Sequence, residues 1–420
     1  MKTTPYIDSS VAKDFTSARL PARVCMHVLE TARTDGRVLR AATALKDAGF
    51  AVSIVDIENA YSQKIEDIDG ISVKHVNVSN AFMTTRFRRL GFMRALSLFL
   101  RSMLLLMQTP ADIYHAHDMT ALPACYLVAL LRRKPLIFDA HELPLKELES
   151  ANRRWLRLLL TPMLAVMIRH STGIISSSPL YAQEICKRYH VAKVSLIRNL
   201  PPYRSVLKSD RLHRHLGLSS PARIALYQGN VQPDRGLDTL VQAAKFLARD
   251  IIIVIMGKAV KETLSQLNAL ITSEGVADRV KIIPPVPYEE LLDWTASADL
   301  GLNVLPPDYS LSIRMSLPNK LFEYLMAGLP VLTSPLDAVT EVISAYDVGQ
   351  IVSSLAPVDV GTAVNTILAD DVALARMHRN ALNAAQHELR WEREMGKLIH
   401  FYRDILNLRF NHEGVNESRE

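Results

Sequence analysis

The segment from Ser316 to Val331, which reads SLPNKLFEYLMAGLPV, has the pattern of a helix with a defined start and end. Ser316 can cap the free N–H groups at the start, and Pro318 in the first turn costs no hydrogen bond. Gly328 suits the left-handed conformation that ends a helix, and Pro330 prevents the helix from resuming. The apolar residues from Val331 onward predict a short strand, so a helix leads directly into a sheet.

Two charged side chains on one face of this helix suit a nucleotide diphosphate. The unpaired N–H groups and the dipole of a helix start attract anions, and Lys320 adds a full positive charge in the first turn. Glu323 follows three residues later on the same face and can accept two hydrogen bonds from a ribose diol. The alternative interpretation is an ordinary surface pair of Lys320 and Glu323 on a packed helix.

Length and composition favour a globular protein of two domains. A chain of 420 residues exceeds the usual size of one hydrophobic core, 49% of its residues are hydrophobic, and its net charge of +6 gives no indication of a nucleic-acid partner. Three cysteines without metal-ligand spacing predict reduced, buried thiols in a cytosolic protein: Cys25, Cys125 and Cys186. We see no secretory signal, and no uncharged apolar stretch of about 18 residues that would span a membrane.

Short apolar segments alternate with helical ones along both halves of the chain. The expected strands are 23–29, 50–57, 71–78, 135–138, 173–176 and 194–197 in the first half, and 223–227, 251–256, 280–283 and 300–305 in the second. Strands joined by helices through short connections indicate parallel sheets covered on both faces. The pair Pro201-Pro202 and the polar run after it mark the predicted domain boundary. We therefore expect an α/β protein with two doubly wound, Rossmann-like domains facing a cleft.

In open parallel sheets, ligands bind at the carboxyl ends of the strands. One such turn contains Gly229, which permits close approach of backbone and ligand. Arg235 follows six residues later, just before a helix, and its planar guanidinium can bind a phosphate. Arg235 could instead be a surface arginine at a helix start. Together with Lys320 it predicts a clamp that would neutralise a leaving diphosphate in place of a metal ion.

These residues resemble a known family. Tyr227-Gln228-Gly229 and Arg235-Gly236-Leu237, with the segment 317–331, are similar to the retaining glycosyltransferases of the GT-B fold, and within these to the broad family 4 of bacterial polysaccharide and glycolipid assembly. In the first half, Asp35-Gly36-Arg37-Val38, His115-Ala116-His117-Asp118 and Asp139-Ala140-His141-Glu142 stand where that family has strand-end loops. The resemblance covers residues 22–405.

The resemblance implies a division of the chain and of the roles within it. It implies an N-terminal acceptor domain at 22–203 after a polar extension 1–21, a nucleotide-sugar donor domain at 204–390, a helix 391–408 that crosses back to the N-terminal domain, and a polar tail 409–420. The implied catalytic residues are His141, Arg235 and Lys320. The implied donor-binding residues are Gly36, Asn199, Gly229, Asn230, Arg235, Gly257, Val286, Asn319, Lys320 and Glu323.

Within this set the resemblance gives particular residues particular roles. Arg235 and Lys320 would hold the diphosphate, and Glu323 the ribose hydroxyls. His141 would lie near the transferred sugar, with Gly36 in the loop beneath it, although a histidine packed behind the sheet edge is the alternative. The turn at Val286 would pass near the base.

Two positions depart from the family pattern. The family often has a second glutamate eight residues before the first, where this chain has Met315, and an arginine after the first glycine, where this chain has Asn230. The absent glutamate bears on which sugar is transferred. The cations Lys320 and Arg235 remain to receive the leaving group.

The resemblance implies a metal-independent enzyme without a cofactor that moves a hexosyl unit, with retention, from a nucleotide-diphosphate sugar to a glycan or lipid-linked acceptor in cell-surface polysaccharide or glycolipid synthesis. Attack would come from the front face of an oxocarbenium-like centre, and the departing phosphate oxygen would take the acceptor proton. No carboxylate nucleophile is evident from the sequence. We expect a cytoplasmic protein.

Three other functions stay open. A sugar-nucleotide epimerase would use the same fold and convert the donor without an acceptor. A non-catalytic sugar-nucleotide-binding protein would fit the departures at Met315 and Asn230. An amidohydrolase-like metal enzyme would use His115, His117 and the pair His141-Glu142 as zinc ligands.

Two segments are both basic and apolar. Residues 86–107 carry five arginines and residues 151–170 carry four, and neither segment contains an acid. Helices of this kind can lie on an anionic membrane, here at its inner face. The alternative is a pair of core-facing helices with arginines on their solvent side.

Overall fold

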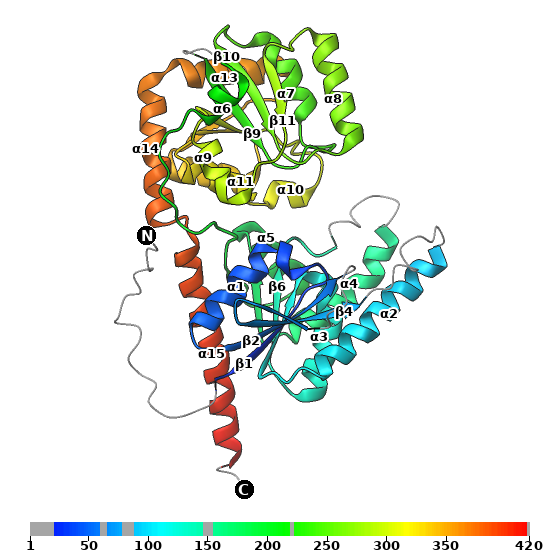
Figure 1. Cartoon of the computed structure of the whole chain (residues 1–420). Helices are drawn as coiled ribbons and strands as arrows, with labels where there is room; N and C mark the ends of the chain where they lie inside the picture. Colours follow the sequence, from blue (N-terminus) through cyan, green and yellow to red (C-terminus); the bar gives the residue numbers. More distant parts are fainter. Residues whose placement is uncertain (1–20, 59–64, 78–87, 146–153, 219–221, 418–420) are drawn as a thin grey trace.

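The computed structural model of the protein describes residues 21–58, 65–77, 88–145, 154–218 and 222–417. It has two α/β domains, one above the other, each built on its own sheet (Figure 1). All of the predicted extension 1–21 except Pro21 lies outside the described residues, as do Arg86 and Phe87 of the first basic segment and 151–153 of the second.

The first sheet has eight strands in the order β3-β4-β2-β1-β5-β6-β7-β8. Their bounds are β1 Arg23–His27, β2 Ala51–Glu58, β3 Ile65–Ile68, β4 Ile71–Asn77, β5 Ile113–His117, β6 Leu136–Ala140, β7 Gly173–Ser176 and β8 Ser195–Leu196. Neighbouring strands are parallel except β3 and β4, which form an antiparallel hairpin. The predicted strands are therefore parallel, and β3 is an additional edge strand that was not predicted, joined to β4 by a two-residue hairpin turn at Asp69-Gly70, both at positive φ.

The second sheet has six strands, all parallel, in the order β11-β10-β9-β12-β13-β14. Their bounds are β9 Arg223–Gln228, β10 Ile251–Met256, β11 Val280–Ile283, β12 Leu300–Asn303, β13 Val331–Thr333 and β14 Gly349–Ile351. Every residue of β10, which reads IIIVIM, is buried. A strand with no polar side is what a sheet covered by helices on both faces requires.

Helices cover both sheets. In the first domain they are α1 Gly36–Asp47, α2 Arg88–Met107, α3 Asp118–Arg132, α4 Arg154–Arg169 and α5 Pro179–Tyr189. In the second they are α6 Arg211–Leu216, α7 Leu237–Ala243, α8 Lys261–Glu274, α9 Leu291–Thr295, α10 Leu311–Met315, α11 Asn319–Met326, α12 Asp337–Tyr346, α13 Pro357–Ala369 and α14 Asp371–His387. Among the described helices, none has the combined length and apolar character needed to cross a membrane.

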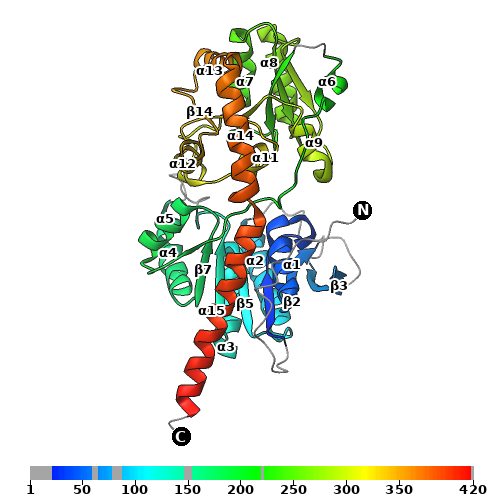
Figure 2. The same ribbon diagram turned by 90° about the vertical axis from the view of Figure 1, so that its left-hand side faces the viewer.

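The last helix, α15 Trp391–Glu417, returns to the first domain (Figures 1 and 2). Its residues Trp391, Leu398, Tyr402 and Ile405 belong to a core cluster formed with β1, β2 and α1. The helix continues to Glu417, so most of the segment predicted as a polar tail is helical.

The two segments that connect the domains lie side by side. The Trp391 N–H donates to the Pro201 carbonyl (2.9 Å), and the Tyr203 N–H donates to the Glu392 carboxylate (3.1 Å). Arg198 forms an ion pair with the buried Glu394 (3.0 Å). The connection after β8 and the start of α15 therefore form one bridge between the domains.

The sequence from Ser316 to Val331 forms a helix and a strand, but the helix starts later than predicted. The Ser316 hydroxyl donates to the Ile313 carbonyl at the end of α10 (3.0 Å), so Ser316 does not cap α11. Pro318 occupies the N-cap position, and within the described chain no side chain caps the first N–H groups of α11. Gly328, at φ +74°, ends the helix as predicted.

Candidate active site

Lys320 lies in the first turn of α11 and reaches the carboxyl end of β9. Its Nζ lies 3.8 Å from the centre of the Tyr227 ring. Gly229 lies beside it, because a Cβ there would be in ordinary van der Waals contact with Lys320 Nζ, at 3.8 Å. Within the described chain this Nζ is buried and has no hydrogen-bond acceptor. A buried cation without an acceptor favours an anionic ligand.

Tyr324 holds α11 against the sheet and so aims Lys320, one helical turn earlier. Its hydroxyl donates to the Leu226 carbonyl (3.0 Å) and accepts from the Gln228 N–H (2.8 Å) at the end of β9. Its ring lies against Gly301 of β12, where a Cβ would come within 2.6 Å of ring atoms. The small residue on β12 therefore lets the helix approach the strand ends closely.

The two predicted glycines at the strand ends shape the loops of this site. Gly257 follows β10 directly, and a Cβ on it would lie 1.8 Å from the Gly229 carbonyl oxygen. Gly229 itself has φ +134°, and its N–H donates to the Met256 carbonyl (3.0 Å). The ends of β9 and β10 can lie this close only because Gly257 has no side chain.

Arg235 precedes α7 and lies near Lys320. Its positive charge helps burial to lower the pKa of Lys320 from 10.5 to about 7, while Glu323 acts in the opposite direction. When the Gln232 amide oxygen faces Arg235, it accepts from Nε (3.1 Å) and Nη2 (2.7 Å). The two predicted cations therefore share one region at the strand ends. Their mutual repulsion would be relieved by an anion bound between them.

Glu323 lies on the same face of α11 as Lys320. Its Oε2 accepts from Gln228 Nε2 (2.5 Å), and Gln228 Oε1 in turn accepts from the Thr295 hydroxyl (2.7 Å). Burial raises the pKa of Glu323, although the hydrogen bond from Gln228 and the charges of Lys320 and Arg40 oppose that rise. Glu323 is thus fixed in place by neighbours and also lines the space between the domains.

A cleft of about 610 Å³ separates the start of α1 from the start of α11. Gly36, Arg37 and Arg40 line it from the first domain, and Asn319 and Glu323 from the second. Asn199, on the bridge, joins the two sides: its side-chain amide donates to Asn319 Oδ1 (3.0 Å) and its oxygen accepts from Arg40. Three predicted donor-site residues, Asn199, Asn319 and Glu323, therefore meet Gly36 across one cleft.

Two predicted residues lie differently. The Asn230 side chain is exposed, and its carbonyl accepts from the Tyr227 hydroxyl (2.9 Å). Val286 packs partly buried against the core of the second domain. Neither lines the cleft described above. Tyr288, which follows shortly after Val286 in the sequence, lines that cleft and also an adjoining pocket of about 340 Å³.

His141 follows β6 in the first domain. Its carbonyl accepts from the Ser177 hydroxyl (2.8 Å), and its Nε2 lies 3.1 Å from His117 Nδ1. Its side chain is 20% exposed. Burial lowers the pKa of His141 to about 4, against the opposing charge of Asp139 and with the help of Arg37 and His117. At neutral pH His141 is therefore an uncharged ring that can donate or accept one hydrogen bond.

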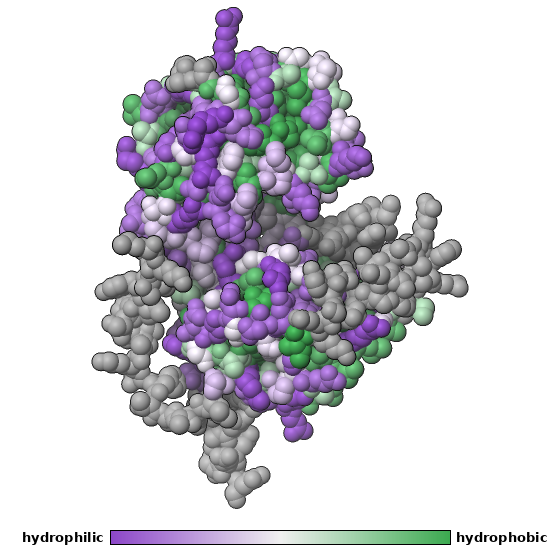
Figure 3. All heavy atoms as spheres, in the orientation of Figure 1, coloured by the Kyte–Doolittle hydropathy of each residue, from purple (hydrophilic) through white to green (hydrophobic). Residues whose placement is uncertain are grey.

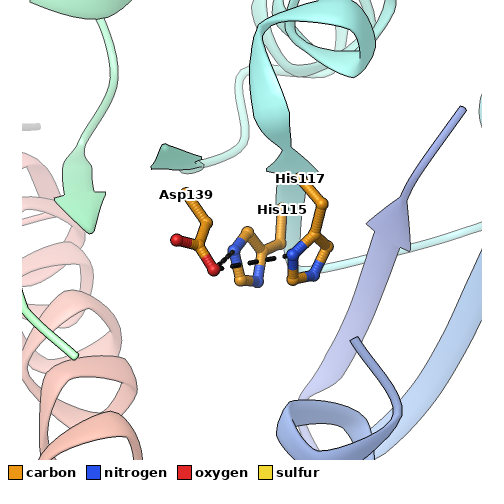
Figure 4. A group of neighbouring side chains, drawn as sticks. All are labelled: His115, His117 and Asp139. Carbon is orange, nitrogen blue, oxygen red and sulfur yellow. Dashed lines mark ion pairs between the residues drawn. The ribbon is translucent and has the colours of Figure 1, made fainter. Parts of the chain in front are cut away.

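A buried carboxylate organises the histidines around it. Asp139 accepts from both Nε (2.9 Å) and Nη2 (2.7 Å) of Arg37, and His117 lies 3.6 Å away (Figure 4). The guanidinium holds the pKa of Asp139 well below its usual range, although burial acts to raise it. His115 stacks on His117, with ring centres 4.0 Å apart, and accepts or donates a hydrogen bond with the Tyr402 hydroxyl of α15 (2.6 Å).

The grouping of His115, His117 and Asp139 differs from the predicted metal-ligand set. Their ligating atoms lie within 4.8 Å of one another, but the carboxylate is Asp139 and neither His141 nor Glu142 joins the group. Both Asp139 oxygens already accept from the positively charged Arg37. A metal ion here would compete with a buried guanidinium for one carboxylate, which disfavours the amidohydrolase interpretation.

Comparison with known families agrees with this architecture. The family model described as "Glycosyltransferase Family 4" matches residues 37–200, and that described as "Glycosyl transferases group 1" matches residues 208–384. The chain is a family 4-like GT-B glycosyltransferase. The two matches meet at the bridge, so each domain of this GT-B glycosyltransferase corresponds to one model.

Individual relatives and solved structures are similar to this GT-B glycosyltransferase at low sequence identity. A D-inositol 3-phosphate glycosyltransferase of Xylanimonas cellulosilytica is 26% identical over 249 residues, which are 56% of this chain and 58% of that protein. The chain thus spans a little over half the length of that relative. Sucrose-phosphate synthase (tll1590) from Thermosynechococcus elongatus has a TM-score of 0.73 at 15% identity, over 92% of this chain and 100% of that one.

A further solved structure, Anabaena Alr3699/HepE in complex with UDP-glucose, has a TM-score of 0.70 at 13% identity and covers 91% of this chain and 99% of its own. At these identities the structural likeness concerns the fold of the GT-B glycosyltransferase.

Sequence reasoning missed several residues that the GT-B glycosyltransferase brings to the cleft. Arg40 reaches Asn199, and its charge acts on Glu323. Gln228 holds Glu323, and Tyr288 lines both pockets. Arg40 lies four residues after Gly36, one turn along α1 on the same face, and this spacing was the signal that could have found it. No local signal indicates the partner of Gln228.

Proposed function

We propose that the protein transfers a hexosyl unit from a nucleotide-diphosphate sugar to a glycan or lipid-linked acceptor. The single observation that carries this proposal is Lys320, whose buried Nζ has no acceptor within the described chain and lies beside Gly229 and close to Arg235. A diphosphate is the group that two cations and the uncapped N–H groups of α11 would bind together. Glu323, one turn further and facing the cleft, suits the ribose hydroxyls.

We infer retention and independence of metal from the same residues. Lys320 and Arg235 supply the positive charge that a bridging metal would otherwise give to the leaving diphosphate. The acceptor oxygen would attack from the side of the leaving group, forming the new C–O bond as the bond to the phosphate oxygen breaks, and that phosphate oxygen would take the acceptor proton. His141, uncharged at neutral pH, would orient the sugar by a hydrogen bond without acting as the main base.

The chemistry of the proposed acceptor is inferred from the side chains that the first domain places at the cleft. Its rim of the cleft carries Glu30, Arg33 and Asp35, all polar, so the acceptor should present hydroxyl or charged groups there. A growing cell-surface polysaccharide or a glycolipid has such groups.

The proposal is tested by measuring turnover. Thermal-shift screening against UDP, GDP, ADP and their sugars selects the donor, since a ligand at 100 times its dissociation constant stabilises by about 2.7 kcal/mol. Transfer from that donor is then measured with and without EDTA, and the anomeric configuration of the product by NMR. Lys320→Ala should abolish transfer, whereas Lys261→Ala, an exposed lysine at the start of α8, should not.

Two outcomes would contradict the proposal. Conversion of the donor sugar without any acceptor would indicate the epimerase. Donor binding without turnover in any acceptor preparation would indicate a sugar-nucleotide-binding protein, the function that Met315 and Asn230 favour.

A further inference from the structure

Helices α2 and α4 of the first domain have apolar outer faces. Met93, Leu96, Leu100 and Leu104 recur every three or four residues along α2 and are between 45 and 61% exposed. On α4, Trp155, Leu158, Leu159 and Met163 are between 45 and 68% exposed. Figure 3 shows hydrophobic residues (green) along the lower right border of the first domain, where α2 lies.

The inner faces of the same two helices are also apolar. Leu98, Phe99 and Met103 of α2, and Leu156 and Leu160 of α4, pack against the core cluster of the first domain. An ordinary surface helix has one apolar and one polar face. These helices expose large apolar side chains on their outer faces as well, and core packing does not account for those residues. Arginines on the solvent side, such as Arg101 and Arg169, fit the interpretation of core-facing helices, but that interpretation does not explain the large apolar side chains exposed beside them.

The charged residues of these two helices are all positive. Neither 93–107 nor 155–169 contains an acidic residue. Beside α4, a groove of about 700 Å³ toward α5 is lined by Arg157, Arg169 and Arg188, with Glu184 as the acid, and Glu184 is paired with Arg188 (2.9 Å). The groove therefore keeps an excess of positive charge next to exposed leucines.

We propose that the first domain binds an anionic lipid membrane through the outer faces of α2 and α4, with lipid phosphates held by the arginine groove between α4 and α5. The exposed leucine, methionine and tryptophan side chains would enter the boundary between headgroups and acyl chains, while the arginines would contact the anionic headgroups. A second copy of the chain is the less favoured occupant, because a two-fold contact would bring the same arginine-rich face of each copy together. The inference does not depend on the reaction that the cleft performs.

Vesicle sedimentation without any nucleotide tests the proposal. The full chain should sediment with phosphatidylcholine vesicles that contain phosphatidylglycerol, and much less with phosphatidylcholine alone. Arg157→Glu with Arg169→Glu should weaken binding to the anionic vesicles by about fivefold for each unit of positive charge removed. Arg249→Glu, a charge change at an exposed position of the second domain, should leave it unchanged.

A second pair of variants tests the apolar contact. Leu158→Ser with Leu159→Ser should reduce binding even to anionic vesicles, whereas Leu207→Ser, an exposed leucine of the second domain, should not. The chain has three tryptophans, and Trp391 is buried while Trp294 lies in the second domain. In a Trp294→Phe, Trp391→Phe protein the emission of Trp155 should shift to the blue when anionic vesicles are added.

Three results would overturn the proposal. The first is equal sedimentation with neutral and anionic vesicles, and the second is an unchanged Trp155 emission at saturating lipid. The third is concentration-dependent dimerisation in analytical ultracentrifugation that the Leu158→Ser, Leu159→Ser protein loses, since it would assign the face to a second copy. Because Leu158 and Leu159 are exposed, thermal unfolding of the leucine variant should match that of the wild type. The fluorescence experiment needs no variant on the face itself.

Discussion

At Lys320, the burial that weakens the folded protein also prepares it for an anion. Among the described residues, the Tyr227 ring and the charge of Glu323 offset the ammonium group's loss of water. Lys320, Glu323 and Arg235 could be predicted from sequence because each belongs to a short local pattern: a helix start, a spacing of three, and a glycine turn. The contact of Gln228 with Glu323 and the Arg37–Asp139 pair could not, because they join residues 95 and 102 positions apart.

Lys320→Met should stabilise the protein in the absence of donor while removing donor binding. The buried charge costs on the order of 1–3 kcal/mol, which methionine of similar shape does not incur. Between about pH 7 and 10.5 the unfolded chain holds a proton on Lys320 that the folded chain does not, so stability of the wild type rises with pH there. The difference in unfolding free energy should therefore be largest below pH 7 and narrow above it. Lys261→Met, at an exposed position, is the control. Equal denaturation midpoints for the wild type and Lys320→Met at pH 6 would refute this prediction.

Donor binding should weaken as pH rises above 7. A bound diphosphate favours the charged form of Lys320, whose pKa in the free protein is about 7, so binding at higher pH must also take up a proton. Calorimetry with a nucleotide sugar, whose phosphates do not titrate in this range, should show affinity falling by up to about tenfold per pH unit. Lys320→Arg stays charged and should give a flat profile. A wild-type profile as flat as that of the arginine variant would contradict the assignment.

At the scale of elements, the strand–helix alternation was predictable, whereas edges and caps were not. The uninterrupted apolar run of β10 predicted a buried strand, and the apolar residues of α1 recur every three or four positions, as in a helix with one buried face. Helix α8 was missed although Leu264, Leu267 and Ile271 follow a helical period and Gly275 ends it in the left-handed conformation. The hairpin of β3 and β4 was missed because the Asp69-Gly70 turn signal was not used.

Gly257→Ala tests the contact of two strand ends. A methyl group there would meet the Gly229 carbonyl, and backbone cannot yield as a side chain can, so we expect a loss of about 1–3 kcal/mol and weaker donor binding. Gly396→Ala in α15 meets no atom within 4 Å and should stabilise by about 0.5–1 kcal/mol. Similar unfolding midpoints for the two variants in urea would disprove the close approach.

Tyr402→Phe tests the link between α15 and the histidines around Asp139. Loss of the hydroxyl leaves buried His115 Nδ1 without its partner, at a cost of about 1–3 kcal/mol. Since His115 stacks on His117, which contacts His141, we also expect a lower kcat with little change in donor KM. Tyr346→Phe, whose exposed hydroxyl bonds to Glu388, is the matched control. An unaltered kcat would leave Tyr402 with a structural role alone.

At the scale of the whole molecule, the described residues of the two domains also meet away from the bridge, where α5 faces α10. The Ser178 hydroxyl donates to the Met315 carbonyl (2.5 Å), and Tyr181 of α5 donates to the Ser312 carbonyl of α10 (2.8 Å). Two domains facing a cleft were predictable from the repeated strand–helix rhythm. The contacts that set their relative position were not, because α10 had no sequence signal that we recognised.

Tyr181→Phe should loosen this contact between the domains. Its hydroxyl is buried against Ser312, so removal costs about 1 kcal/mol, and alignment of donor and acceptor groups should suffer with it. We expect kcat/KM for transfer to fall by roughly fivefold, in proportion to that energy. Tyr126→Phe, in the same domain but with its ring edge-to-face on His170, should keep the wild-type value. Small-angle scattering of the two variants would show whether the first has become more extended.

Because the segment around Arg198, Pro201 and Tyr203 is bonded alongside the start of α15, both covalent passages of the chain run along one side of the molecule. Rotation of one domain against the other is then confined to a single pivot axis at that side, and sliding or twisting would break the bonds between the passages. Along the described part of the chain, no covalent crossing lies on the opposite side. A polymeric acceptor of the kind we propose would therefore enter and leave sideways there, without its end having to pass through a closed ring.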